Sequence, residues 1–528
     1  MLRNRLRSLY QRLPLGRAVP RNTSGHHPTG TPTPPAGAPP NVTVAHGGGS
    51  IARNAAAMMV AQVMTWTATF LLILHLPRAL GAETYGKLNF SLALMGLFAS
   101  FVDFGTTTLV TREVARDRSR AEAYLTNVLV LKSVTAVLAY LGLLGSTVLI
   151  GRSPDIVHLV FIFGIGMMID AIARLADSLL QAYEYVHYQA WGEVMDKVLH
   201  TALVLFLLAQ GYGIVPIAWA MTAMNAVRLL RNGYWVLRLV RPRLHLLNLG
   251  FMRQAMLASL PFFLFAVFAK VYDKVDITML GMMASDTVVG YYGAAYRLFT
   301  SLFFVPHILY TITFPVLSRL WAADQAAYRQ AVRRSFAALS VAAVGVLVCT
   351  VVLAEPVVDL LYTRAEFPGT APALRILALA LACQYVNTAA VMVLQTTDRQ
   401  TQWARAGALA ALVNPAINYL LIPPLGHLGA AATTVITEAM LLVLAVRACP
   451  PGSLRLEDAR ALVRSLLAGG FLAGALLLGL RWGLAGALLL GLPVYTAAVI
   501  RLGAVSREDL ALAKLTVRSH LRAVRKAA

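Results

Sequence analysis

Charged residues are scarce in this chain of 528 residues: Asp, Glu, Lys and Arg make up 13% of it, whereas 58% is hydrophobic. Soluble domains carry about 25% charged and about 45–50% apolar residues, so this composition excludes an ordinary soluble enzyme. Cysteine is rare too, and its three residues, Cys349, Cys383 and Cys449, all lie among apolar neighbours. Such cysteines usually act as small hydrophobic side chains, and their spacing predicts neither a disulfide framework nor a metal site.

Enzyme signatures are lacking as well. No Walker A, HExxH or GxSxG motif occurs, and the longest loop expected outside the cell, near residues 355–371, is too short for a catalytic domain. The net charge of +22 would suit nucleic acid only if the basic residues formed one face of a folded domain, but they fall between apolar segments. We therefore expect a protein that is not an enzyme, uses no cofactor or metal and binds no nucleic acid.

What the chain does contain is a succession of long apolar runs from residue 51 onwards. Their length suits a helix that crosses a bilayer, which needs about 20 residues. The predicted fold class is an all-α polytopic membrane protein with about fourteen transmembrane helices. The expected spans are 54–77, 88–110, 124–150, 156–180, 194–210, 213–237, 255–282, 287–311, 334–354, 372–396, 403–422, 427–446, 463–480 and 484–503.

Charge and composition also predict topology and domains. If the N-terminus is cytoplasmic, most of the 46 Lys and Arg residues fall in cytoplasmic loops, and both ends lie inside. Residues 1–50, basic and then Pro-rich, predict a disordered cytoplasmic tail. The expected division is completed by a first lobe at 51–240, a second lobe at 241–450, two further spans at 451–503 and a basic cytoplasmic tail at 504–528.

A weak internal repeat supports two lobes. Residues 81–86 (GAETYG) and the aromatic segment after them match residues 285–290 (SDTVVG) and the segment that follows, roughly 200 residues further on. Each loop joins an outward-going span to an inward-going one. We expect two six-helix lobes in a parallel pseudo-repeat, with two C-terminal helices outside it.

Several ionisable residues fall inside the expected spans, where each costs about 2.5–3.5 kcal/mol and usually faces a bundle interior or a wet cavity. Asp170, Arg174 and Asp177 lie on one stripe of a helix, so Arg174 could bridge both carboxylates. The triad is either a structural ion cluster or part of a transport path. Glu438 stands alone in its span and is either a protonation site or a hydrogen-bonded structural residue.

The seventh span carries four charges within seven residues. Lys270, Asp273 and Lys274 share one face, and Asp276 lies further round the helix. They must line a cavity or a lobe interface. In the next span Arg297 has no carboxylate within one turn, so it needs either an anionic ligand, such as a phosphate, or an ion pair with Asp273 or Asp276.

Other charges lie near the expected inner ends of the first three spans. Arg53, Asp103 and Arg112, with Lys132 further inside, could form a basic inner vestibule. Arg53 and Arg112 could equally be anchors that extend towards the headgroups.

Six short segments together resemble the bacterial polysaccharide repeat-unit flippases of the multidrug/oligosaccharidyl-lipid/polysaccharide exporter superfamily. They are residues 80–90 (LGAETYGKLNF), 102–105 (VDFG), 111–116 (TREVAR), 272–281 (YDKVDITMLG), 289–297 (VGYYGAAYR) and 314–318 (FPVLS). They occur in the family's order over roughly residues 51–450. The resemblance implies a two-lobe transporter of polyprenyl-diphosphate-linked oligosaccharide that works by alternating access in the bacterial inner membrane, for surface polysaccharide such as O-antigen or exopolysaccharide.

The resemblance also implies roles for the buried charges. Arg297, Lys270, Lys274 and Lys132 are candidates to meet the diphosphate, and Asp273, Asp276, Asp170 and Glu438 are candidates for ion coupling or for holding those cations. The expected partners are the lipid-linked glycan, the bilayer and a polysaccharide polymerase or export machinery. Three alternatives stay open: a cation-coupled multidrug antiporter of the same superfamily, a flippase for a peptidoglycan precursor, and a membrane glycosyltransferase or polymerase.

Overall fold

A computed structural model describes residues 48–453 and 459–505. The chain divides into two compact units, residues 1–58 and 59–528; apart from the start of the first helix, the helices and sites described below belong to the second. The expected tail at 1–50 lies outside the described residues except for its last turn, and the tail at 504–528 lies outside them after residue 505.

Every regular element in the described part of the chain is a helix, which confirms the all-α expectation. The first group is α2 (Gly48–Asp103), α3 (Thr106–Arg116), α4 (Ala121–Leu149), α5 (Pro154–Ala182), α6 (Val186–Ala209) and α7 (Ile214–Leu239). The second is α8 (Leu249–Met283), α9 (Asp286–Ser301), α10 (Phe304–Ala323), α11 (Gln325–Tyr362), α12 (Thr370–Thr396), α13 (Gln400–Leu425) and α14 (His427–Ala448). Two helices, α15 (Ala459–Gly479) and α16 (Gly483–Arg501), complete the set.

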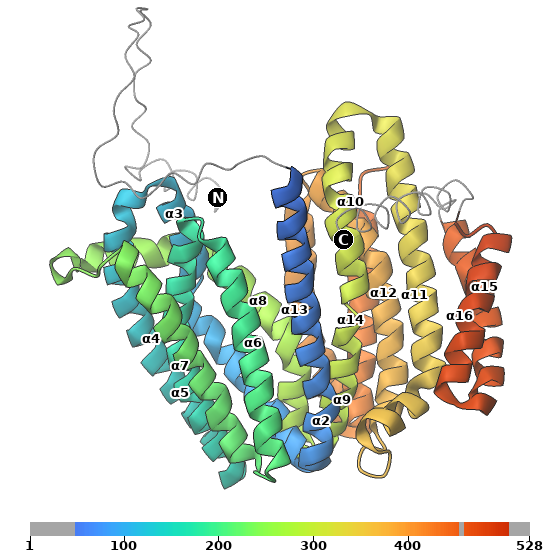
Figure 1. The fold of residues 1–528 in the computed structure, drawn as a ribbon, viewed down its shortest axis with the longest axis horizontal. Helices are drawn as coiled ribbons and strands as arrows, with labels where there is room; N and C mark the ends of the chain where they lie inside the picture. Colours follow the sequence, from blue (N-terminus) through green and yellow to red (C-terminus); the bar gives the residue numbers. More distant parts are fainter. Residues whose placement is uncertain (1–47, 454–458, 506–528) are drawn as a thin grey trace, which may run out of the picture. The chain divides into compact units, whose positions relative to one another are not determined.

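The helices pack both on their neighbours along the chain and on helices one or more positions further on. In the first group α5 packs between α4 and α7, and in the second α12 contacts both α11 and α14 (Figure 1). The last two helices, α15 and α16, pack on each other and on α11, so they extend the second group at its edge. Each expected span falls on helix. Within residues 48–453 and 459–505, ten segments are long and apolar enough to cross a membrane by length and composition, so the chain is a multi-pass membrane protein. Fourteen crossings stay a prediction.

Two expected spans are interrupted. The second ends early because Phe104 and Gly105 have positive φ angles of 44° and 70°, and a new helix starts at Thr106. A Cβ at Gly105 would lie 2.6 Å from the Phe263 nitrogen, so glycine is needed both for the backbone turn and for the close packing of α3 on α8. The eighth expected span is divided between α9 and α10 at Leu302–Phe303.

The repeat appears in the structure as a reciprocal contact. A Cβ added at Gly86 would lie 1.7 Å from the carbonyl oxygen of Asp286, and one added at Gly290 would lie 1.9 Å from that of Ala82. These residues are the paired positions of the two repeat segments, so each segment presents the same surface to the other. Arg152 reinforces this end, because it forms an ion pair with Asp286 and donates to the Gly281 carbonyl at 2.7 Å.

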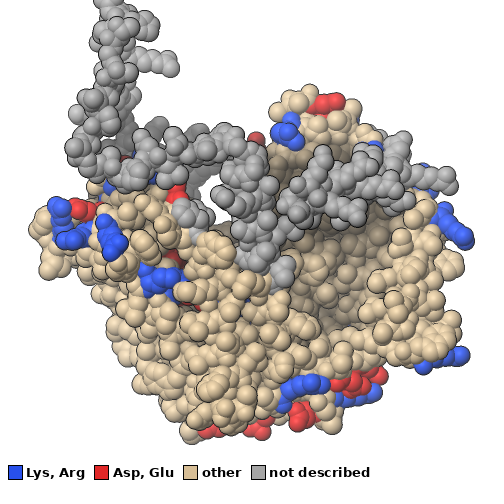
Figure 2. Space-filling model, viewed as in Figure 1, with Lys and Arg blue, Asp and Glu red and all other residues tan. Residues whose placement is uncertain are grey.

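Charged side chains gather at the two ends of the helices. On the face drawn in Figure 2, a broad region between the ends carries almost no Lys, Arg, Asp or Glu. That distribution suits a belt in contact with hydrocarbon, where exposed charge is costly.

Candidate functional site

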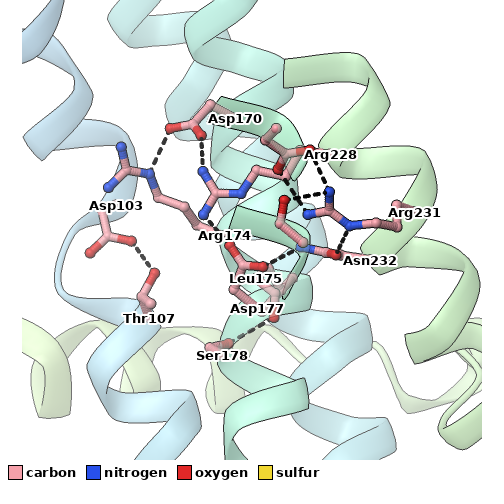
Figure 3. A network of polar contacts seen from close by, with 12 residues as sticks. Asp103, Thr107, Asp170, Arg174, Leu175, Asp177, Ser178, Arg228, Arg231 and Asn232 are labelled. Carbon is pink, nitrogen blue, oxygen red and sulfur yellow. Dashed lines mark hydrogen bonds and ion pairs between the residues drawn. The ribbon is translucent and has the colours of Figure 1, made fainter. Parts of the chain in front are cut away.

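Ion pairs between α5 and α7 form the centre of a polar network in the first helix group. Asp170 on α5 accepts from Arg174 Nε at 2.6 Å and from Arg228 Nη1 on α7 at 3.1 Å. Arg228 also pairs with Asp177, which accepts a further hydrogen bond from Asn232 (Figure 3). The bridge between the two carboxylates is therefore Arg228, and the expectation that Arg174 would span both is corrected, because its Nε is engaged at Asp170.

A second part of the network joins α2, α3 and α4. Lys132 is fully buried, and its Nζ lies 2.7 Å from Asp103 Oδ1 and 3.3 Å from Thr107 Oγ1. Thr107 also donates to Asp103 (Figure 3). Lys132 therefore has no free surface for an anionic ligand in this conformation.

The network as a whole is close to electrically neutral. Its carboxylates are Asp103, Asp170 and Asp177, and its cations are Lys132, Arg174 and Arg228. A buried charge that has a counter-charge and hydrogen bonds does not need a ligand. Of the two explanations for the triad on α5, the geometry fits the structural ion cluster.

The second helix group holds a carboxylate in a different environment. Asp276 on α8 is 5% exposed and accepts from Asn418 Nδ2 at 2.6 Å, from Thr434 Oγ1 at 2.8 Å and from the Tyr292 hydroxyl at 3.1 Å. None of these donors is charged. Asn414 extends the set by accepting from Asn418 at 2.7 Å.

Glu438 on α14 is also buried without a cation. It is 4% exposed, and its Oε1 accepts from the Tyr272 hydroxyl at 2.5 Å. The two lysines of α8 do not neutralise it, because both lie at Asp273, with Nζ–Oδ2 distances of 3.7 Å for Lys270 and 3.3 Å for Lys274. The expectation that Lys270, Asp273 and Lys274 share one face of the helix is confirmed.

Two cavities adjoin these acids. A small one of about 160 Å³ lies between Asp276 and Glu438 and is also lined by Asp273 and Tyr296. A larger one of about 880 Å³ lies among α2, α8, α10, α12, α13 and α14 and includes Glu438 in its wall. Tyr272, Phe303, Gln384 and Glu438 line both cavities.

Arg297 on α9 has an exposed side chain. It interacts electrostatically with Lys197 and His200 of α6. Among the described residues none of the three forms an ion pair with a carboxylate. The expected ion pair of Arg297 with Asp273 or Asp276 is therefore absent, since the first is held by lysines and the second by neutral donors.

The sequence did not single out Lys197 or His200, because Lys197 follows Asp196 directly and looked neutralised by it. The signal that could have found them is their spacing on α6, which places both on one side of the helix.

The expected inner vestibule is only partly described. Arg112 pairs with Glu113 at 2.8 Å and lies over the Phe262 ring at 5.2 Å, which fits an anchor at the end of α3. Asp103 belongs to the ion pair with Lys132. The side chain of Arg53 lies outside the described residues.

Comparison with known families places these sites in context. The family described as "Polysaccharide biosynthesis protein" matches residues 51–321, which is just over half of the chain. The chain belongs to this family. A second family, described as MatE, matches residues 261–420, and both fit the exporter superfamily that the motifs resemble.

Individual relatives of this polysaccharide family member are distant. The chain is 23% identical to "Probable flippase AglR" of Haloferax volcanii, over 80% of this chain and 88% of that protein. It is 22% identical to "Probable low-salt glycan biosynthesis flippase Agl15" of the same organism, over 75% and 82%.

Solved structures share the fold. One titled "Lipid II flippase MurJ, inward closed conformation" has a TM-score of 0.67 at 13% identity and covers 84% of this chain and 97% of that one. An inward-facing multidrug resistance MATE family transporter has a TM-score of 0.58 at 16% identity and covers 74% and 96%. The chain thus has the fold of a membrane transporter.

Proposed function

We propose that this protein is a flippase that moves polyprenyl-diphosphate-linked oligosaccharide repeat units across the bacterial inner membrane by alternating access, for surface polysaccharide biosynthesis. The observation that carries the proposal is the group of Arg297, Lys197 and His200, basic side chains that form no ion pair with a carboxylate of the described residues, in a member of the polysaccharide family. The two archaeal relatives are named as flippases, one of them in glycan biosynthesis. Transport rather than catalysis is the role that these relatives support.

The chemistry of the substrate matches this group. A diphosphate is a compact anion, and a guanidinium binds phosphate oxygens in a bidentate geometry and stays charged when water is removed. Lys197 of α6 adds a second basic side chain, and His200 adds a hydrogen-bond donor whether or not it is protonated. We assign the diphosphate first to Arg297 and Lys197. Lys270 and Lys274 are secondary candidates, because each would have to leave Asp273.

Ion coupling is assigned to the acids of the second helix group. A buried carboxylate without a cation must bind a proton or a metal cation, because an isolated charge is too costly in the interior. Asp276 has oxygens of Thr434, Tyr292 and Asn414 nearby, and Asn418 Oδ1 is buried with no hydrogen-bond donor. Such a set of oxygens suits a hard monovalent cation or a proton. Glu438 would take the second position along the same cavity.

Two alternatives follow from specific observations. The uncompensated acids at Asp276 and Glu438, together with the MatE match over residues 261–420, favour a cation-coupled multidrug antiporter. The fold match to the lipid II flippase favours a peptidoglycan precursor as substrate. The antiporter would share the coupling site with the main proposal, and the peptidoglycan-precursor flippase would share the diphosphate. Each differs from the main proposal in the molecule that it transports. A polysaccharide polymerase or export complex is the expected partner.

The test uses a strain that lacks this gene. We expect polyprenyl-diphosphate-linked oligosaccharide to build up on the inner leaflet while the surface polymer disappears, and the intact gene to reverse both effects. Arg297→Ala should reach the membrane at the normal level but fail to restore the polymer. Normal polymer without accumulation, also in a strain cleared of related flippases, would contradict the proposal. Altered drug resistance in that strain would then favour the antiporter.

A further inference from the structure

The large cavity beside Glu438 has the lining of a binding site. It lies among α10, α12 and α14, which pack on one another through α12, and its volume of about 880 Å³ is within the 300–1,000 Å³ typical of small-molecule sites. Its aromatic walls are Trp66, Phe303, Phe304, Tyr310 and Trp403. Its polar groups are His307, Thr311, Gln384, Asn387, Thr388 and Glu438.

Two amides of α12 lack the hydrogen bonds that buried polar groups normally make. Asn387 is 4% exposed, and its Oδ1 is buried without a partner; the Oε1 of Gln384 is buried without a partner too. Over nine-tenths of buried polar groups in folded proteins are paired, because an unpaired one costs about 1–3 kcal/mol. Both amides are one turn apart on one face of α12 and line the cavity. Their unused hydrogen-bonding capacity points to a ligand with several polar groups.

The walls indicate which ligand this is. A polyprenyl tail would need apolar walls and would leave both amides unpaired. A simple cation would use Glu438 but would not need aromatic faces. A sugar ring has C–H faces that pack on the negative face of aromatic rings, and hydroxyls that both donate and accept. An amide side chain offers a carbonyl acceptor and two N–H donors, which matches neighbouring hydroxyls of a sugar.

We infer that this cavity is a subsite for a pyranose ring of the transported glycan, with Asn387 and Gln384 as its hydrogen-bonding residues and Trp403 and Trp66 as its aromatic walls. The inference rests on the proposed function and adds a second contact, distinct from the cations that meet the diphosphate. Glu438 belongs to the wall of this subsite and to the small cavity next to Asp276. Sugar binding and ion binding would therefore share one carboxylate.

The test measures what a sugar adds to binding. The full chain in lipid nanodiscs is titrated with farnesyl diphosphate and with farnesyl diphosphate that carries one N-acetylglucosamine, glucose or galactose. We expect at least one sugar-bearing probe to bind about tenfold more tightly than the bare diphosphate, the gain that one or two good hydrogen bonds provide. Asn387→Leu and Gln384→Leu should remove that gain and leave the affinity for farnesyl diphosphate unchanged.

Stability separates a binding role from a structural one. Because Asn387 Oδ1 has no partner in the folded protein, Asn387→Leu should leave the unfolding temperature unchanged or raise it. Gln402→Leu is the matched control, since Gln402 is exposed on α13 next to Trp403 and does not line the cavity. It should retain the full gain from the sugar.

The contradicting outcomes are distinct. If the wild type binds all probes equally, or if the two variants keep the gain, the sugar subsite is wrong while the flippase proposal stands. If Asn387→Leu lowers the unfolding temperature by several degrees and keeps the gain, the amide is structural and the inference fails. If the wild type binds neither the bare diphosphate nor any sugar-bearing probe, the proposed function fails, and the subsite fails with it.

Discussion

Ionisable side chains inside the helices fall into two classes, which differ in whether a counter-charge is present. Asp103, Asp170 and Asp177 each have a cation within hydrogen-bonding distance. Asp276 and Glu438 have only neutral donors. The first class is explained by the fold itself, whereas Asp276, Glu438 and Arg297 need a counter-charge that the described residues do not supply. The presence of a counter-charge, more than the degree of burial, therefore separates charged residues with a structural role from those with a functional role.

That separation predicts opposite effects on stability for two arginines. Arg228→Ala should lower the free energy of unfolding by about 3–5 kcal/mol, because it leaves Asp170 and Asp177 buried with less counter-charge. Arg297→Ala should change it by less than about 0.5 kcal/mol, because an exposed side chain away from special contacts contributes little. Thermal unfolding of both purified variants in one detergent measures this. Equal losses would show that Arg297 is structural.

The charged residues could be identified from the sequence, but not all of their partners. The shared face of Lys270, Asp273 and Lys274 was predictable, since it depends only on helical periodicity within one segment. The role of Arg228 as the bridge to Asp170 and Asp177 was not, because partners on different helices depend on packing that one sequence does not reveal. Arg228 lies in the second half of α7, and in the sequence it stands with Arg231 and Arg238, which resemble the positive charges of a cytoplasmic loop.

Among the helices, the contact between the repeat segments depends on two glycines. Gly290→Ala would place a Cβ 1.9 Å from the Ala82 carbonyl, so the backbones must separate. We expect a loss of about 1–3 kcal/mol in unfolding free energy, the usual cost of overpacking, and weaker transport because this end can no longer close fully.

Gly407→Ala is the control for this change. Gly407 lies inside α13 with open space around its Cβ position, so alanine there should be neutral or add up to about 1 kcal/mol through helix propensity. Thermal unfolding and complementation measure both variants. If Gly290→Ala behaves like Gly407→Ala, the close contact of the two repeat segments is not required.

The start of α11 should respond to pH. Asp324 caps this helix from outside the membrane, and hydrogen bonds from the backbone N–H groups of Ala327 and Ala326 hold the pKa of its carboxyl below the ordinary value. A depressed pKa means that the cap's stabilisation is fully present above the unfolded-state pKa, about 3.9, and is lost as pH falls through the folded-state pKa.

Hydrogen exchange at these two amides tests the cap. In the wild type, protection should fall at acidic pH. Asp324→Asn keeps the acceptor oxygen, so the protection of the two amides in this variant should not depend on pH. In Asp324→Ala the two amides should be poorly protected at every pH. Protection that is independent of pH in the wild type would show that the carboxylate is not the cap.

Helix positions were largely predictable, and one of their two interruptions was not. Every expected span lies on helix because length and hydrophobicity dominate at this scale. The break at Gly105 depends on the close approach of α3 to α8, which one sequence does not reveal. The break at Leu302–Phe303 could have been found, because Pro306 has no N–H to donate to the Leu302 carbonyl and is tolerated only in the first turn of the new helix.

Across the entire protein, a cation group for diphosphate, an acidic site for a coupling ion and an aromatic cavity for sugar belong to one proposed transport cycle. The sequence predicted Arg297, Asp276 and Glu438 as candidates, but it did not predict that Lys197 and His200 join Arg297. It did not predict the third, because Trp66, Gln384 and Trp403 are far apart in the chain and come together only in the folded protein.

Transport by the purified protein is the decisive measurement. The chain is reconstituted in liposomes with polyprenyl-diphosphate-linked oligosaccharide, and the outer-leaflet fraction is measured with a membrane-impermeant glycosidase or lectin, with and without an imposed sodium or proton gradient. We expect an ion gradient to accelerate translocation and Arg297→Ala to abolish it. Asp276→Asn should lower the acceleration by the gradient about tenfold, which is within the usual range of coupling free energies. Translocation no faster than in protein-free liposomes under any gradient would contradict the flippase proposal.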